Sequence, residues 1–334
     1  MGARMNRSIR SAALAVALVT ALLFNGLAKG HAANWKDPSK HTVHFIEVEP
    51  GVRLEVLDWG GSGEAVLLLA GHGDTGHIFD DFAPRLAHHF HVLAITRRGF
   101  GASSQPDHGY DLPRMVEDIA QVVDALKLTR VHLVGHSIAG DEMTRFARTY
   151  PQKLGKLVYL EAAYDRVEAQ RLEAIFPKLP PSPVHESGSP ESVRQFIAQT
   201  EILMPEAEIR ATRVFGSDGQ FQRPATPDRI LGAVAKMVEH PDYASIHAPM
   251  LAIYAVYQTP AQFFPAYSIA DQERRQGIDQ IFRIWQPFAK SQRDRFRRAV
   301  PTARVEEIEG ANHYVFISNP ERVSRQTSEF LRTQ

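Results

Sequence analysis

The stretch from Arg130 to Met143, RVHLVGHSIAGDEM, decides the fold. It opens with the run VHLV at 131–134, and a short run rich in valine and leucine is typical of a buried parallel strand. Small residues follow at once in GHSIAG at 135–140, and apolar residues then recur at helical spacing through Phe146. The stretch therefore predicts a strand, a tight turn and a helix, with Ser137 at the apex of the turn.

A serine at this position has the surroundings that nucleophilic catalysis needs. Small neighbours let the backbone bend sharply, and a helix that begins just behind Ser137 supplies free backbone N–H groups and a partial positive charge. Both would stabilise an oxyanion formed when Ser137 attacks a carbonyl group. The competing interpretation is a glycine-rich turn between a strand and a helix that carries an ordinary, unreactive serine.

The segment Gly135-His136-Ser137-Ile138-Ala139 resembles the nucleophile elbow, G-x-S-x-G, of the α/β-hydrolase superfamily, in its serine esterase and lipase branch. The one departure is Ala139, which replaces the last glycine and is itself small. The resemblance implies an α/β fold with a mostly parallel central sheet, helices on both faces, and a helical cap inserted after the sixth strand. It also implies that Ser137 is the catalytic nucleophile.

The rest of the chain alternates strands and helices, as such a sheet requires. Two segments with alternating apolar residues predict an antiparallel hairpin at a sheet edge, at 41–49 and 52–59. Further strands are predicted at 65–70, 90–95, 156–160, 249–256 and 304–308, and helices at 113–126, 288–299 and 320–331. Prolines cluster after residue 166, and no strand is evident from there to 247. The predicted division is core 33–165, cap 166–248 and core 249–334.

Residues 1–32 have the layout of a secretory signal peptide. Arg4, Arg7 and Arg10 precede an apolar run at 12–24, and Gly30-His31-Ala32 fits a cleavage site with small residues. We therefore expect an exported protein, periplasmic or secreted, with no stable membrane association after cleavage. The alternative is a membrane anchor that stays uncleaved, although the apolar run is short for a bilayer span.

The composition excludes several function classes. The formal net charge is zero, so nothing indicates nucleic-acid binding. The chain has no cysteine, which excludes disulfides and a thiol nucleophile.

A second glycine-rich loop, GHGDTGH at 71–77, follows the predicted strand at 65–70. It resembles the oxyanion loop of the same superfamily, which implies that the backbone N–H groups of His72 and Ile138 are the oxyanion donors. His72 and His77 could instead bind a metal ion, but no carboxylate or cysteine is evident at ligand spacing, so no metal and no cofactor is expected. The loop RRGFGAS at 97–103 resembles a structural R-G-x-G-x-S loop beside the site.

The base and the acid of a triad follow in the order serine, acid, histidine in this superfamily. His313 lies after the last predicted strand in GANHYVF (310–316), close to the superfamily's G-H-[YF] ending, which implies that it is the base. No carboxylate directly follows the predicted strand at 249–256, whereas Glu161 ends the sixth strand, where some relatives place the acid. Because parallel strands end at one sheet edge, Glu161 could reach the same histidine. Asp165, Asp271 and a dyad without Glu161 remain alternatives.

The predicted function is hydrolysis of a small-molecule carboxylic ester or lactone through an acyl-enzyme intermediate. Dehalogenases and epoxide hydrolases of this fold need a carboxylate at the elbow, whereas Ser137 favours acyl transfer. The aromatic residues at 263–267 suggest a small or medium apolar acyl or alcohol group. Alternatives are an amide or peptide hydrolase resembling proline iminopeptidases, a cofactor-free perhydrolase, and a non-catalytic ligand-binding protein on the same fold. The oligomeric state is not predicted.

Overall fold

The computed structural model describes residues 35–182, 186–199 and 202–333. The predicted signal peptide, 1–32, lies outside the described residues. Among the described helices, none combines the length and the apolar character that a membrane span requires.

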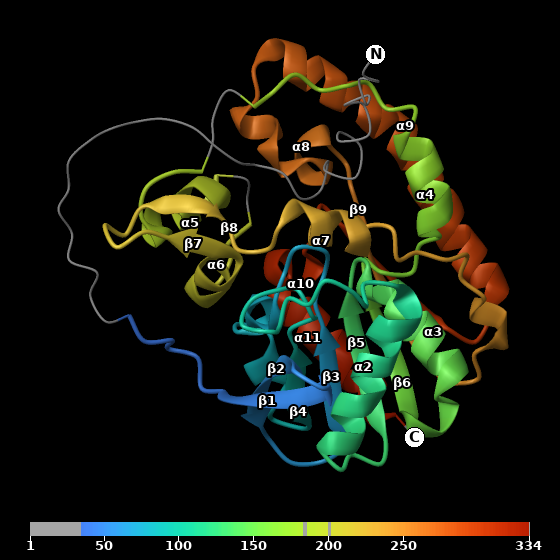
Figure 1. Ribbon diagram of the computed structural model, residues 1–334. Helices are drawn as coiled ribbons and strands as arrows, with labels where there is room; N and C mark the ends of the chain where they lie inside the picture. Colours follow the sequence, from blue (N-terminus) through green and yellow to red (C-terminus); the bar gives the residue numbers. More distant parts are fainter. Residues whose placement is uncertain (1–34, 183–185, 200–201, 334) are drawn as a thin grey trace, which may run out of the picture.

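An eight-stranded sheet forms the centre of the fold, with the strand order β1-β2-β4-β3-β5-β6-β9-β10 (Figure 1). β1 pairs antiparallel with β2, and β2 pairs antiparallel with β4, while all other neighbours are parallel. This confirms the predicted edge hairpin and the mostly parallel sheet. The strands are β1 Thr42–Glu49, β2 Val52–Gly60, β3 Ala65–Leu69, β4 His91–Ile95, β5 Val131–His136, β6 Leu154–Leu160, β9 Met250–Val256 and β10 Arg304–Glu309.

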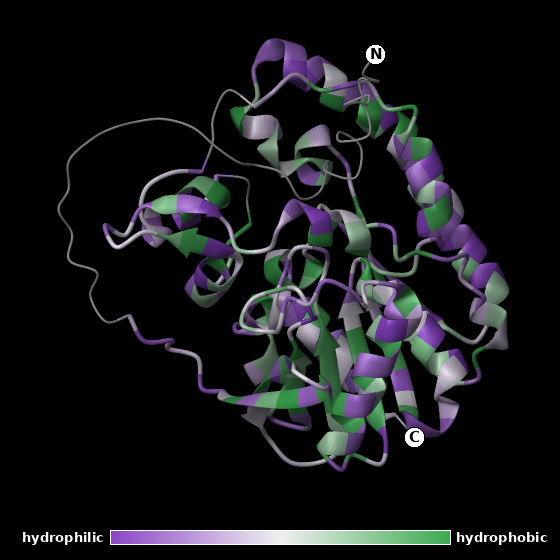
Figure 2. Cartoon of the chain, viewed as in Figure 1, coloured by the Kyte–Doolittle hydropathy of each residue, from purple (hydrophilic) through white to green (hydrophobic). Residues whose placement is uncertain are grey.

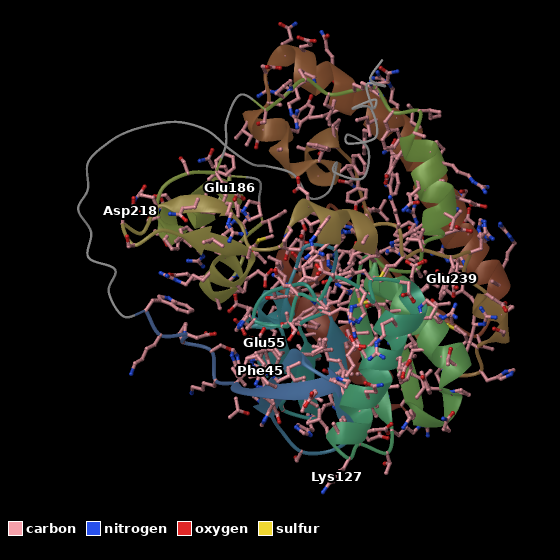
Figure 3. The ribbon with its side chains drawn as sticks, viewed as in Figure 1. Phe45, Glu55, Lys127, Glu186, Asp218 and Glu239 are labelled. Carbon is pink, nitrogen blue, oxygen red and sulfur yellow. The ribbon has the colours of Figure 1, made fainter. Side chains whose placement is uncertain are left out.

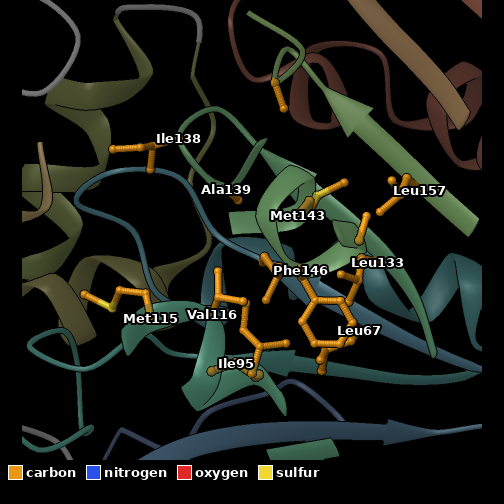
Figure 4. Packing of buried hydrophobic residues seen from close by; sticks show 14 of the residues in the cluster. Leu67, Ile95, Met115, Val116, Leu133, Ile138, Ala139, Met143, Phe146 and Leu157 are labelled. Carbon is orange, nitrogen blue, oxygen red and sulfur yellow. The ribbon is translucent and has the colours of Figure 1, made fainter. Parts of the chain in front are cut away.

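Helices cover both faces of the sheet, and β5 is buried between them. Leu133 packs in one apolar cluster with α2 (Leu112–Ala125) and α3 (Ala139–Thr149), as Figure 4 shows for α3. The next residue, Val134, points to the opposite face and packs with η1 (Gly76–Phe79), α1 (Ala83–Leu86) and α11 (Pro320–Arg332). Side chains alternate between the faces of a strand, so a strand that is apolar at successive positions must be covered on both sides. The apolar colouring of the central strands in Figure 2 follows this arrangement.

Within its described residues, the segment 166–248, predicted as a cap, contains four short helices, a 3-10 turn and a small antiparallel hairpin. The hairpin of β7 and β8 was not predicted, because its strands are only three and four residues long and none of their residues is fully buried. Figure 3 shows Glu186 and Asp218 in the part of the segment that carries the hairpin. The elements are α4 Arg166–Glu173, α5 Pro190–Ala198, α6 Glu206–Thr212, β7 Arg213–Phe215, β8 Phe221–Pro224, α7 Asp228–Val234 and η3 Tyr243–Ser245.

The helix predicted at 288–299 is the end of a longer helix, α9, which spans Gln272–Ala299. The prediction was wrong about its start because Pro287 lies inside it, and proline usually marks a helix boundary. Asp271 caps the true start by accepting a hydrogen bond from the Arg274 N–H (2.9 Å). The remaining elements are η2 Pro151–Lys153, α8 Pro260–Phe263, η4 Pro265–Ile269 and α10 Val315–Ser318.

Candidate active site

Ser137 lies at the sharp turn between β5 and α3. Its φ of 54° is in the left-handed region, where a residue with a side chain is strained by about 1–3 kcal/mol. Its N–H donates to the Leu160 carbonyl at the end of β6 (3.2 Å), and its own carbonyl accepts from the Gly140 N–H (3.0 Å) and from the Arg166 guanidinium. The residues on either side are buried, whereas Ser137 is only partly buried. The turn therefore holds a strained serine at the end of the central strand.

Close packing around the turn explains its small residues. A Cβ atom at Gly140 would lie 2.0 Å from the Ala162 carbonyl oxygen, and one at Gly135 would lie 2.2 Å from Met143 Sδ and 3.0 Å from Ala139 Cβ. Ala139 itself is fully buried in the apolar cluster on this face of the sheet. Ala139, which departs from the G-x-S-x-G pattern, is therefore accommodated. The position at which only glycine fits is the next residue, Gly140.

His313 and Glu161 meet at the carboxyl ends of the parallel strands. His313 lies between β10 and α10, Glu161 directly follows β6, and His313 Nδ1 is 3.3 Å from Glu161 Oε2. A carboxylate can only accept, so Nδ1 donates to Glu161, and in the neutral ring Nε2 carries the free lone pair. His313 Nε2 is buried and has no hydrogen-bond partner within the described residues. When the ring is neutral, Nε2 is thus its proton-accepting atom.

Glu161 is 1% exposed and holds three hydrogen bonds besides the one from His313. The Ala255 N–H and the Tyr164 hydroxyl donate to Oε1 (2.8 and 3.0 Å), and the Tyr257 hydroxyl donates to Oε2 (2.7 Å). Burial and the Glu161 charge raise the pKa of Tyr257 well above its ordinary value, so its hydroxyl remains a donor. The end of β9, where the superfamily often carries the acid, therefore supplies hydrogen-bond donors to Glu161, which directly follows β6. Sequence reasoning noted the missing acid there but missed these donors.

His136 connects the serine turn to His313. It directly precedes Ser137, its Nε2–H donates to the His313 carbonyl (3.1 Å), and the two imidazole rings lie 4.6 Å apart. Burial, and then the charge of His313, lower the pKa of His136 well below its ordinary value, so this ring is neutral. The contact places Ser137 and His313 on neighbouring segments. Sequence reasoning missed this residue, whose only signal is its place in the elbow.

The two other carboxylates considered from the sequence have different partners. Asp165 caps α4, and its Oδ2 contacts His240 (2.8 Å) and Arg295 (3.1 Å). Asp271 caps α9. Within the described part of the chain, Glu161 is the carboxylate that contacts the His313 ring.

Arg97 holds the loop at 71–77, which carries His72, the second predicted oxyanion donor. Its guanidinium donates to the carbonyls of Ala70 (2.9 Å) and Gly71 (3.2 Å) and pairs with Glu142 (2.5 Å). Because C=O and N–H point in opposite directions across a trans peptide, the His72 N–H points away from Arg97. The His72 ring contacts the Leu231 carbonyl of α7 (2.9 Å), and burial lowers its pKa.

Two buried carboxyl groups, one within the loop at 71–77 and one packed against it, were not predicted. Asp74 is 6% exposed, its Oδ2 lies 3.9 Å from His136 Nδ1, and burial raises its pKa to about 6 although the Tyr314 hydroxyl donates to it (3.4 Å). Glu208 of α6 accepts from the N–H and hydroxyl of Thr75 (3.1 and 2.5 Å). Burial, and then the Asp74 charge, raise the pKa of Glu208 to about 8. Both groups are far from the elbow in sequence, so only the fold reveals them.

Curated relatives match the chain over part of its length. It is 35% identical over 111 residues to the putative carbamate hydrolase RutD of Caulobacter segnis, a match that covers 32% of this chain and 42% of that relative. The chain spans less than half the length of the first curated relatives that it matches.

Solved structures match nearly the whole chain at low sequence identity, which shows the fold alone. E-2-(acetamidomethylene)succinate hydrolase matches with a TM-score of 0.64 and 19% identity over 88% of this chain and 100% of the other. Carboxylesterase CesB from Bacillus subtilis matches with a TM-score of 0.57 and 14% identity over 89% of this chain and 93% of the other. The model of the alpha/beta hydrolase family matches residues 66–326. The chain therefore belongs to the alpha/beta hydrolase family.

Proposed function

We propose that the chain is a serine hydrolase that cleaves a small-molecule carboxylic ester or lactone. The observation that carries this proposal is the buried contact between His313 and Glu161, joined through His136 to a strained serine turn. Strained backbone persists at a site only where surrounding structure maintains it, and Ser137 and Glu161 are two of the three non-glycine residues with positive φ in the described chain.

In the proposed reaction, Ser137 Oγ attacks the carbonyl carbon of the substrate while His313 Nε2 takes the hydroxyl proton. The tetrahedral intermediate then expels the alcohol, which takes that proton back from His313, and an acyl-enzyme remains. Water adds to the acyl carbon with the same proton transfers and releases the acid. Glu161 holds Nδ1–H and stabilises the imidazolium that forms in each step.

The proposed oxyanion site uses the backbone N–H groups of Ile138 and His72. Ile138 directly precedes α3, where unpaired N–H groups and the helix dipole favour negative charge. The Arg97 contacts to the carbonyls of Ala70 and Gly71 fix the peptide that carries the His72 N–H. Backbone donors held in place before the reaction stabilise the developing charge without reorganising.

An aromatic cluster next to Glu161 supports an apolar substituent on the substrate. Phe263 stacks on Trp285 with ring centroids 5.5 Å apart and contacts Tyr257 at 5.4 Å. The Tyr257 hydroxyl donates to Glu161, so this cluster adjoins the proposed acid. A serine nucleophile with an apolar wall favours esters or lactones of small or medium apolar groups, and a carboxylesterase is among the proteins that share the fold.

The test measures hydrolysis of p-nitrophenyl esters from acetate to palmitate and, in parallel, of p-nitroanilides. The proteins compared are the wild type, Ser137→Ala and the control Ser245→Ala, which changes an exposed serine. We expect ester turnover and fluorophosphonate labelling that vanish only in Ser137→Ala. Preference for the anilides would assign an amide hydrolase instead. Absence of both turnover and labelling in the wild type would favour a ligand-binding protein.

We also propose that residues 1–32 direct export of the protein. Their basic start, apolar run and small residues at 30–32 support this proposal. N-terminal sequencing of the exported protein should begin near Ala33, and a chain that retains residues 1–32 would identify an anchor instead.

A further inference from the structure

Four potential metal ligands gather beside η1, two from the segment before β1 and two from within and just after η1. Asp37, His41, His77 and Asp80 each offer one ligand atom, and these atoms lie within 4.8 Å of one another. We propose that these four side chains bind one zinc ion that fastens the start of the described chain to η1.

The distances between the ligand atoms suit a tetrahedral zinc ion. Zinc bonds of about 2.1 Å place tetrahedral ligands about 3.4 Å apart. His77 Nδ1 lies 3.4 Å from Asp37 Oδ2 and 3.3 Å from Asp80 Oδ2, and His41 Nδ1 lies 3.3 Å from Asp80 Oδ1. Contacts of this length link all four side chains, with Asp80 Oδ2 toward His77 and Asp80 Oδ1 toward His41.

The donor types distinguish zinc from the alkaline-earth ions. Magnesium and calcium prefer sites made of oxygen atoms, whereas imidazole nitrogens suit zinc and its transition-metal neighbours. Four protein ligands complete the coordination of zinc and leave no position for a substrate, so the proposed site is structural. From the sequence, no carboxylate was evident at ligand spacing for His72 and His77, whereas the structure brings two carboxylates to His77: Asp37, which is remote in sequence, and Asp80, which approaches through the turn of η1.

Burial gives an independent indication of a cation. The side chains of His41 and Asp80 are 3% and 6% exposed. Asp80 Oδ1 is buried and accepts no well-aligned hydrogen bond within the described residues, although His41 Nδ1 lies 3.3 Å from it. A carboxylate oxygen removed from water is costly without a well-aligned donor, and a metal ion between Asp80 and His41 would satisfy it.

A carboxylate lies behind the His77 ring, where the second shell of a metal site would be. Glu55 Oε1 lies 3.8 Å from His77 Nε2, on the side of the ring away from the proposed ion. Glu55 is itself held by the Thr96 hydroxyl (2.7 Å). A carboxylate behind a ligating histidine fixes the ring and increases its basicity.

The same contacts without zinc would be an ion-pair network. In that state burial lowers the pKa of His77, but hydrogen bonds and charges from Asp80 and Glu55 raise it to about 10, so the ring is protonated. Zinc binds the neutral ring and would displace this proton. The two states therefore differ in whether the protein takes up a metal.

The proposed ion would also stabilise the loop that carries His72. Thr75 lies where this loop enters η1 and caps that helix, accepting a hydrogen bond from the His77 N–H (3.2 Å). Fixing His77 therefore fixes the end of the loop. The zinc site itself does not depend on the proposed hydrolase function.

The experiment treats the purified chain with a chelator and titrates it with Zn²⁺ by calorimetry, with metal content measured before and after. We expect one zinc ion per chain, a higher Tm with zinc, and the intense visible bands of tetrahedral Co²⁺ after substitution. His41→Gln and Asp80→Asn should each weaken zinc binding at least 100-fold. The matched control is His91→Gln, which alters a histidine that pairs with Asp58 (3.0 Å), and it should bind zinc normally.

Glu55→Gln provides a variant that keeps all four ligands. It should weaken zinc binding about 10–100-fold, the usual effect of removing an outer carboxylate. The proposal is overturned if wild-type protein binds Zn²⁺ only with a Kd above about 10 µM, as weak surface sites do. It is also overturned if His41→Gln and Asp80→Asn bind Zn²⁺ as well as the control does. Preferential binding of Mg²⁺ or Ca²⁺ would also overturn it.

Discussion

Replacing Glu161 with glutamine tests how the structure sets the protonation of His313. The carboxylate accepts from four donors, of which the Ala255 N–H is fixed by the backbone (2.8 Å to Oε1). A glutamine can place its oxygen at the Oε1 position and accept from Ala255, but its NH₂ group then faces His313 Nδ1. The ring would have to move its proton to Nε2, and a protonated Nε2 cannot take the proton of Ser137.

The opposite orientation of the glutamine keeps the correct ring tautomer but sets its NH₂ group against the Ala255 N–H. Leaving one buried donor unsatisfied costs about 1–3 kcal/mol, so roughly 0.6–16% of molecules retain the productive tautomer. The variant also loses the negative charge that stabilises the imidazolium. Together these effects predict a fall in kcat of about 10³–10⁴-fold for Glu161→Gln, close to the 10⁴ known for an acid-to-amide change in a serine protease triad.

The assay combines ester turnover with the rate of fluorophosphonate labelling, because labelling needs an activated Ser137 and not a particular substrate. Circular dichroism establishes that the fold persists, and ¹⁵N NMR of the His313 ring reports which nitrogen is protonated. The matched control is Asp165→Asn, since Asp165 contacts His240 and Arg295 and asparagine also caps helices well. A folded Glu161→Gln protein that keeps more than about a tenth of wild-type kcat would refute the reasoning.

Two further predictions concern stability. Gly140→Ala should destabilise the fold by about 2–3 kcal/mol or more, because its Cβ would lie 2.0 Å from the Ala162 carbonyl oxygen. The control Gly232→Ala, in α7, places a Cβ that meets nothing within 4 Å and should be neutral or stabilising. Equal denaturant midpoints for the two variants would contradict this prediction. Glu208 has a pKa of about 8 in the fold against an ordinary 4.5, so its contribution to stability is complete below about 4.5 and is lost as the pH rises toward 8. Glu208→Gln, which does not titrate, should therefore flatten the fall in Tm between pH 5 and 8, and an unchanged slope would show that other groups cause it.

The sequence predicted the framework of the fold because the signals of that framework are local. The valine and leucine run at 131–134, the small residues at 135–140 and the helical spacing behind them lie within one short stretch, and the structure has β5, the turn at Ser137 and α3 there. The motif order also nominated Ser137, Glu161 and His313, and the structure brings the last two within 3.3 Å. Their catalytic roles stay predictions until the variants are measured.

Tertiary structure decided what depends on contacts between remote segments. The Ala255 and Tyr257 donors to Glu161, the Thr75 contact to Glu208, and the His77 contact to Asp37 join parts of the chain 40 to 133 residues apart. No spacing rule marks such partners, because burial and distance arise only when strands and helices pack. The sequence by itself determined the order of elements and the turn that carries Ser137. Packing decided among the acids that the sequence left open, and it alone determined which carboxyl groups are buried and which four side chains gather beside η1. Each of these needs close approach in space between residues that are far apart in the chain.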